Sequence, residues 1–161
     1  MDPTDLISPQ ESSTSQEISE HGVLHLCLPV TPSANTILGW AWSQSSHLSI
    51  YKRDAASAVW TAVTIALGSV PRARGTYWAE CATLSIIRCS RSRRRIDDDN
   101  VVGGCKYSRD ALVSTGVLID DNPGRLQMAY PVEDRAMGKW QGLHGPATHF
   151  FLTRREGNKN D

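Results

Sequence analysis

The stretch from Thr76 to Cys89 reads TYWAECATLSIIRC and decides the fold that we expect of this chain. It is rich in residues that favour β-structure, and its side chains can be divided between two faces. Every second residue from Tyr77 to Ile87 lies on one face, whereas Trp78, Leu84 and Ile86 lie on the other. We therefore predict a β-strand here, which delivers the chain into a cluster of arginines.

Two elements are expected upstream of this strand. Residues 23–28 alternate between apolar and polar positions, which predicts a half-buried strand closed by Pro29 and followed by a turn-like segment at 31–35. Residues 48–67 contain no Gly or Pro, and Gly68 follows them. Six residues recur there at helical spacing, namely Ala55, Ala58, Val59, Ala62, Val63 and Ala66. An amphipathic helix ending at Gly68 is therefore predicted.

A second helix is predicted downstream, from residue 100 to about residue 115, with Gly116 as its stop. Three of its side chains are expected to face the core: Val102, Cys105 and Leu112. The pair Gly103 and Gly104 weakens the first turn, so we expect the regular helix to begin only near Cys105.

The remaining apolar segments complete the predicted fold. A short run at 117–119 carries Asp120 and Asp121 at its end, and segments 126–132 and 146–153 are expected to form a closing hairpin. This order of elements predicts a single α+β domain in which a mixed β-sheet is packed with two main helices.

Charge is distributed unevenly along the 161 residues, although the formal net charge is zero. Residues 1–22 hold five acids and no Lys or Arg, so the rest of the chain holds 12 acids against 17 bases, a net of +5. We expect a disordered acidic leader at 1–22, a folded domain at 23–153 and a polar C-terminal tail at 154–161. The moderately basic domain is compatible with nucleic-acid binding.

The cysteines and the apolar runs exclude several classes of protein. Four cysteines (Cys27, Cys81, Cys89 and Cys105) form no C-x-x-C pair, which argues against a zinc ribbon or a disulfide framework. The start of the chain lacks the features of a signal peptide, and no apolar run approaches the length of a membrane span. We expect a cytoplasmic, nucleoid-associated protein with reduced thiols and no membrane contact.

Acidic residues follow a basic run between Arg93 and Asp121. The segment 93–100 reads RRRIDDDN. In an extended segment Asp97 and Asp99 point to the same side, and a strand-helix-strand unit would bring Asp121 close to them. Such closely packed carboxylates repel one another, so a divalent cation that neutralises them is expected. Three oxygen ligands suit Mg²⁺, for which Mn²⁺ can substitute.

A plainer interpretation of these aspartates also stands. Asp triplets are often solvated loop residues or helix caps, and Asp99 or Asn100 is well placed to cap the helix that follows. Two other phosphate or metal motifs are excluded. An EF-hand would need an oxygen ligand where Val101 stands, and the segment 103–107 lacks the spacing of a P-loop.

The same segment resembles the signature of the RusA-type Holliday junction resolvases. In that family a basic run precedes Asp-x-Asp-Asn, then a Lys, then Asp-x-Leu four residues later, and finally Gly, an apolar run and Asp-Asp. The matching residues here are Asp97 to Asn100, Lys106, Asp110 to Leu112 and Gly116 to Asp121. A weaker match lies upstream, where Pro32-Ser33-Ala34-Asn35 resembles an early loop of the family. Two departures are three extra residues between Asn100 and Lys106, and Ile96 in place of a basic residue.

The resemblance implies a RusA-like fold and a Mg²⁺-dependent endonuclease that cuts four-way DNA junctions in recombination and repair. It implies that Asp97, Asp99 and Asp121 bind the metal, and that Lys106 stabilises charge on the phosphate in the transition state. It also implies a homodimer, because two symmetric cuts need two sites related by a two-fold axis. The alternative for Lys106 is a surface ion pair with Asp110.

Several residues outside this set could contact DNA. Five arginines could bind phosphates of the junction arms, namely Arg88, Arg91, Arg93, Arg94 and Arg95. Trp40 and Trp42 could stack on unpaired bases, or could be core residues near a helix start. Two alternative functions remain: a junction-binding protein that has lost cleavage, and a metal-dependent phosphoesterase acting on other branched DNA.

Overall fold

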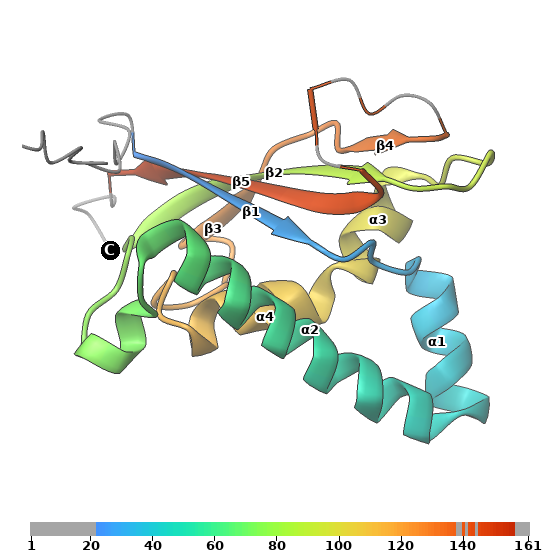
Figure 1. Cartoon of the computed structure of the whole chain (residues 1–161), viewed down its shortest axis with the longest axis horizontal. Coiled ribbons are helices and arrows are strands. Elements are labelled where there is room, and N and C mark those ends of the chain that lie inside the picture. Colours follow the sequence, from blue (N-terminus) through green and yellow to red (C-terminus); the bar gives the residue numbers. More distant parts are fainter. Residues whose placement is uncertain (1–21, 138–139, 141, 144, 157–161) are drawn as a thin grey trace, which may run out of the picture.

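A five-stranded mixed sheet lies at the centre of the computed structural model, which describes residues 22–137, 140, 142–143 and 145–156 (Figure 1). The long strand β5 (Ala147–Arg155) pairs antiparallel with β1 (Val23–Leu28) on one side and with β2 (Cys81–Cys89) on the other. The predicted strand at 23–28 is therefore confirmed. The predicted strand at 76–89 begins later, because residues 76–80 form a loop whose backbone bonds to residues 116 and 117.

The predicted closing hairpin is wrong, because its two segments lie on opposite sides of β2. Two short strands, β3 (Leu126–Met128) and β4 (Glu133–Arg135), both run parallel to β2. The first pairs with the beginning of β2 and the second with its end. They behave as one interrupted edge strand, so β2 is flanked along its length. The C-terminal strand β5 continues to Arg155, two residues beyond the predicted end of the domain.

Four α-helices lie on one face of the sheet, where two were expected: α1 (Ala34–Ser43), α2 (Ser45–Leu67), α3 (Asp98–Gly104) and α4 (Lys106–Ser114) (Figure 1). The predicted helix before Gly68 is confirmed, and that glycine ends α2 with a φ of 73°. A short 3₁₀ helix (Pro71–Arg74) follows. No helix within the described residues is long and apolar enough to cross a membrane.

Helix α1 was not expected, because residues 31–35 read as a turn. The side chain of Ser33 caps this helix by accepting a hydrogen bond from the Thr36 amide, at 3.2 Å. Only Ile37 is buried in the whole helix, so α1 has no buried apolar stripe of the kind that predicts an amphipathic helix. Its presence therefore depends on the cap and on packing against α2 and α3.

The predicted second helix is divided in two at Cys105, and its first part begins earlier than expected. Gly103 and Gly104 lie inside α3, where they allow close approach to the connection between β1 and α1. A Cβ atom at Gly104 would stand 1.9 Å from the carbonyl oxygen of Pro32, and one at Gly103 would stand 2.6 Å from Ala34 Cβ. The two glycines are therefore explained by packing rather than by a weakened helix.

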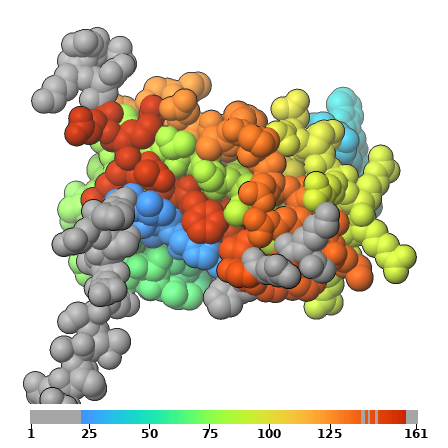
Figure 2. Space-filling view, turned by 90° about the horizontal axis from the view of Figure 1, so that it is seen from above, coloured from blue at the N-terminus to red at the C-terminus, as the bar shows by residue number. Residues whose placement is uncertain are grey.

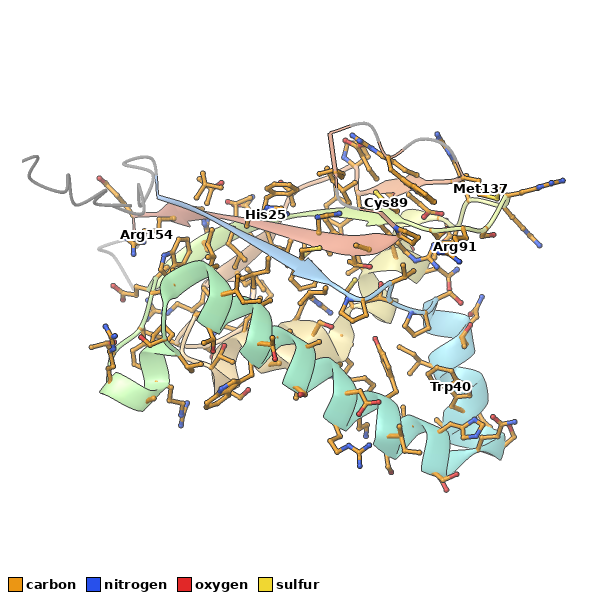
Figure 3. The ribbon with its side chains drawn as sticks, in the orientation of Figure 1. His25, Trp40, Cys89, Arg91, Met137 and Arg154 are labelled. Atoms are coloured by element: carbon orange, nitrogen blue, oxygen red, sulfur yellow. The ribbon has the colours of Figure 1, made fainter. Side chains whose placement is uncertain are left out.

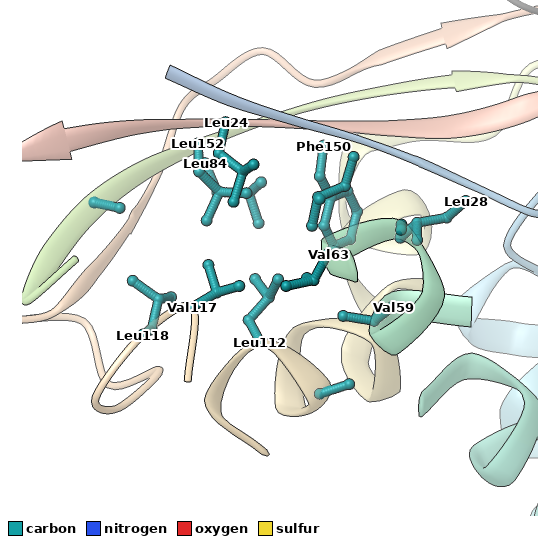
Figure 4. Close-up of a cluster of buried hydrophobic side chains, with 14 of the residues drawn as sticks. Leu24, Leu28, Val59, Val63, Leu84, Leu112, Val117, Leu118, Phe150 and Leu152 are labelled. Atoms are coloured by element: carbon teal, nitrogen blue, oxygen red, sulfur yellow. The ribbon is translucent and has the colours of Figure 1, made fainter. Parts of the chain in front are cut away.

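The two faces of the sheet differ. Figure 2 looks onto the face opposite the helices, where the strands reach the surface. On this open face His25 of β1 stacks on Phe151 of β5 with ring centroids 4.4 Å apart (Figure 3). The other face forms the single hydrophobic core with the helices (Figure 4). Its largest fully buried apolar side chains include Leu26, Leu84, Ile86, Leu112, Leu118, Phe150 and Leu152. A single α+β domain with a mixed sheet is thus confirmed.

Candidate functional site

The first acidic group lies at the amino end of α3 rather than in an extended segment. Asp97 is the N-cap of this helix, and its Oδ1 accepts hydrogen bonds from the backbone N and the Nδ2 of Asn100, both at 2.9 Å. Asp98 and Asp99 form the first turn. The expectation that Asp97 and Asp99 alternate along a strand is therefore wrong, and so is the choice of Asp99 or Asn100 as the cap. The helix dipole stabilises negative charge at the amino end of a helix, so the three aspartates are favourable there.

A buried ion pair fixes the backbone that leads to Asp97. Arg88 near the end of β2 contacts Asp134 of β4, with Nη1 and Oδ1 2.9 Å apart and both side chains nearly inaccessible. The other oxygen of Asp134 accepts a hydrogen bond from the Ile96 amide at 2.8 Å, and Arg88 Nε donates to the Thr31 carbonyl at 2.8 Å. Arg88 is therefore a positioning residue, and its expected role in phosphate contact is wrong. The sequence carries no local signal for this pair, because its members are 46 residues apart.

The basic lip is the set Arg91, Arg93, Arg94 and Arg95, in the loop between β2 and α3. All four side chains are exposed. None of the four forms an ion pair with any other residue that the structure describes. The loop is held at its base, where Ser90 N donates to the Arg135 carbonyl. Positive charge that is free of carboxylate partners is thus displayed directly before the amino end of α3.

Lys106 begins α4 and faces a carboxylate one turn along that helix. Its Nζ lies 3.0 Å from Oδ2 of Asp110, and both side chains are largely exposed. This is the surface pair that the sequence offered as the alternative role of Lys106. Such a pair contributes only a few tenths of a kcal/mol, so an anionic ligand could compete with it for the lysine.

Asp121 lies beside the other end of β2. The chain from Gly116 to Leu118 bonds to the loop before β2, through pairs such as Ala79 N to the Val117 carbonyl at 3.0 Å. A few residues later Leu126 pairs with Ala82, the second residue of β2. Asp97, by contrast, follows the segment fixed by Arg88, the eighth residue of β2. Ala82 and Arg88 are six residues apart, which is roughly 20 Å along β2 at about 3.3 Å per residue, so the two aspartates lie toward opposite ends of this strand.

The parallel pairing of β2 and β3 explains this separation. A crossover leaves one strand at its carboxyl end and enters the next parallel strand at its amino end. Asp97 follows the carboxyl end of β2 and Asp121 precedes the amino end of β3. The connection itself therefore places them at opposite ends of these two neighbouring strands. Accordingly, no group of three metal-binding side chains is found within the described residues. Asp97, Asp99 and Asp121 of one chain therefore do not fit a single Mg²⁺ ion.

A polar cavity of about 520 Å³ lies next to the turn that follows Asp120 and Asp121. Its walls include Glu80, Asn122, Arg125 and Arg155. Arg125 pairs with Glu80, and Asp120 holds the turn through hydrogen bonds from Asp121 N at 2.7 Å and Asn122 Nδ2 at 2.6 Å. Sequence analysis did not find these surrounding residues, since they come from three separate strands and loops.

A buried cysteine follows α3. Cys105 joins α3 to α4, and burial raises its pKa to about 11, so the thiol is uncharged at neutral pH. Its Sγ lies 3.4 Å from the hydroxyl of Thr31, which is also buried. The Cys105 thiol therefore packs as a small apolar group.

Neither models of known protein families nor the curated protein sequences gave a match to this chain.

Proposed function

We propose that this protein is a Mg²⁺-dependent, structure-selective endodeoxyribonuclease of the RusA type that acts on four-way DNA junctions as a homodimer. The observation that carries the proposal is the basic lip, which displays four exposed and unpaired arginines directly before three aspartates at the amino end of α3. Arginines bind phosphates, and acidic residues beside a bound phosphate are the usual means of placing a divalent cation on it. The order of motifs from Arg93 to Asp121 supports the same function through its resemblance to that family.

The proposed homodimer would account for the failure of one chain to gather the three carboxylates. If Asp97, Asp99 and Asp121 serve one metal ion, then Asp121 must come from a second copy, because in its own chain it lies toward the other end of β2. A two-fold pair would then hold two identical sites, each built from both copies. Paired incision of two strands would need that symmetry.

A second candidate function is junction binding without cleavage. Two observations favour it: Asp97 is already engaged as a helix cap, and Lys106 is already paired with Asp110. In this case the basic lip would bind DNA, and the acidic residues would serve only to cap and stabilise the amino end of α3.

One assay separates these candidates. Wild-type protein and Asp99→Asn are incubated with a labelled four-way junction, or with a linear duplex of the same sequence, in Mg²⁺. Symmetric nicking of the junction that disappears in Asp99→Asn supports the endonuclease. Tight junction binding with no nicking supports the binding protein. Equal cutting of both DNAs contradicts the resolvase proposal, and so does the absence of both binding and cutting. If other branched DNA is cut in preference to the four-way junction, that DNA is the substrate.

A complementation experiment tests whether each site is shared between copies. Asp99→Asn and Asp121→Asn are expected to be inactive alone. If they are mixed and allowed to exchange partners, each mixed dimer contains one site with both mutations and one site with neither. About half of the dimers are mixed by random exchange, so single-strand nicking should return to about a quarter of the wild-type site number. No recovery after verified exchange would place all ligands in one chain and contradict the shared site.

A further inference from the structure

An exposed apolar stripe runs along helix α1. Trp42 is 89% exposed and Leu38 is 56% exposed. Because each residue of a helix turns by about 100°, these two lie on the same face as Asn35 and Gly39, whereas the buried Ile37 lies on the opposite face. Trp42 is therefore not a core residue, which was one of the two roles that the sequence left open for it.

The two tryptophans of α1 have different environments. Trp40 is partly buried and packs edge-on against Tyr51 and His47, with ring centroids 5.6 Å and 6.4 Å away. Trp40 thus holds α1 against α2. Trp42 forms no such contact among the described residues, so the fold itself gives no reason for an aromatic ring there.

The stripe begins at the candidate site. The amide of Asn35 donates to Oδ1 of Asn100 at 3.2 Å, and Asn100 in turn bonds to Asp97. Trp42 stands seven residues further along α1, or roughly 10 Å at a helical rise of 1.5 Å per residue. This is about the height of three stacked bases. A strand whose phosphate lies at the amino end of α3 therefore has bases within reach of Trp42.

The surface between these two points is open. A Cβ atom at Gly39 would meet nothing within 4 Å, so packing inside the chain does not require a glycine there. The absence of a side chain at that position leaves the helix backbone exposed beside Leu38 and Trp42, and we call this surface the shelf. A planar ring can lie on such a shelf, with the indole as its stacking partner.

The occupant that fits this surface is a nucleobase. Helix α1 contains no acidic residue, and the basic lip lies at the same end of the molecule, as the positions of Arg91 and Trp40 show (Figure 3). Helix α1 itself carries no charge, and the basic lip supplies positive charge at the same end of the molecule for the phosphates of a bound strand. Two exposed apolar side chains on a ten-residue helix are also far smaller than the surface of about 800 Å² per partner that a stable protein interface needs. A single base needs no more than one ring.

We propose that Trp42, beside Leu38 and Gly39, is a stacking platform for an unpaired base at the branch point of DNA. This inference rests on the proposed function, since it names how that same site selects branched over linear DNA. Linear duplex offers no unstacked base, so the platform would contribute to junction binding alone.

The test uses the full chain in an Asp99→Asn background, so that DNA is bound without being cut. A four-way junction carries 2-aminopurine at its branch point, and a linear duplex carries it at a paired position. We expect Trp42→Ala to weaken junction binding between about 5-fold and 100-fold, with little change for the duplex. Trp42→Phe should retain most of the affinity, because it keeps an aromatic face. Trp60→Ala, which removes a half-exposed tryptophan from α2, is the matched control and should bind as the parent does.

A second variant keeps the tryptophan and removes the shelf. Gly39→Leu should weaken junction binding as Trp42→Ala does, although Trp42 is intact, because the leucine side chain covers the exposed backbone. Unchanged junction affinity in both Trp42→Ala and Gly39→Leu would overturn the platform while leaving junction cleavage by the wild-type protein as a separate result. If Trp42→Ala instead converts a dimer to a monomer in gel filtration, the tryptophan is a contact between copies and the inference is also overturned. A parent protein that binds neither DNA would refute both this inference and the proposed function.

Discussion

The two ends of β2 carry similar residues in opposite surroundings. At the end next to α3, an arginine and an aspartate form a buried pair (Arg88 with Asp134) that holds the backbone before Asp97. At the end next to β3, Arg125 and Glu80 form an exposed pair beside an open polar cavity. One end is a fixed scaffold, and the other is a solvated loop.

This difference shows how a motif can be continuous in sequence and divided in space. The segment from Asp97 to Asp121 spans one crossover between parallel strands, so its first and last aspartates lie at opposite ends of the strands. The predictions that follow compare these two ends, each with a control from the other end or at the same position.

The largest effect is expected from Asp134→Ala at the buried end. The substitution leaves the Arg88 guanidinium buried without its carboxylate and removes the acceptor of the Ile96 amide. Breaking a buried pair costs about 3–5 kcal/mol of unfolding free energy, because an uncompensated charge stays inside. Urea unfolding measures this loss. Glu80→Ala at the exposed end is the control and should leave the midpoint almost unchanged; equal losses for both variants would show that the two ends do not differ.

The general fold was predictable from the sequence where the apolar periodicity is strong. Residues 23–28 and the long helix before Gly68 have clear patterns, and both predictions are confirmed. The positions of β3 and β4 were not predictable, because three-residue strands carry too little pattern to reveal that they pair with β2 rather than with β5. Helix α1 was missed because a cap and tertiary packing, rather than a buried apolar stripe, support it.

The candidate site was predictable in its residue types and not in its geometry. The acidic and basic residues are as close in the chain as expected, and the arginine lip is exposed. The distance between Asp97 and Asp121 depends on the strand order, which no local pattern encodes. The buried support from Asp134 is likewise a contact over 38 residues to Ile96. Whether the acidic residues act on DNA stays a prediction.

The next effect concerns the pH dependence of stability at the α3 end. Burial raises the pKa of Cys105 to about 11, whereas the thiol in the unfolded chain ionises near 9. The contribution is therefore fully present below pH 9 and is lost as the pH rises through 11. Each pKa unit corresponds to about 1.4 kcal/mol, so the loss approaches about 3 kcal/mol at high pH. Urea unfolding at about pH 8 and about pH 10.5 should show a smaller fall for Cys105→Ala than for the wild type; parallel falls would assign the pH dependence to other groups.

A smaller loss is expected from an added methyl group at the tightly packed end. In Gly104→Ala the new Cβ would stand 1.9 Å from the Pro32 carbonyl oxygen, so α3 and the connection to α1 must move apart. Overpacking of this kind costs about 1–3 kcal/mol. The control is Gly124→Ala in the loop near Asp121, where the nearest atom is a side-chain oxygen of Asn122 at 3.2 Å that can give way. Thermal unfolding should show a clear drop only for Gly104→Ala, and the reverse order would contradict the contrast between the ends.

The smallest effect separates the two roles of Asp97. Asp97→Ala removes the cap of α3 and should cost about 1 kcal/mol of unfolding free energy, whereas Asp97→Asn keeps an oxygen that can accept from the Asn100 amide and should cost much less. If Asp97 is also a metal ligand, both variants should lose junction nicking to a similar degree, although only one loses stability. If nicking instead follows stability, so that Asp97→Asn stays active, the residue is a cap alone. Because the cap already occupies Oδ1, a ligand role for Asp97 would rest on its other carboxylate oxygen, Oδ2.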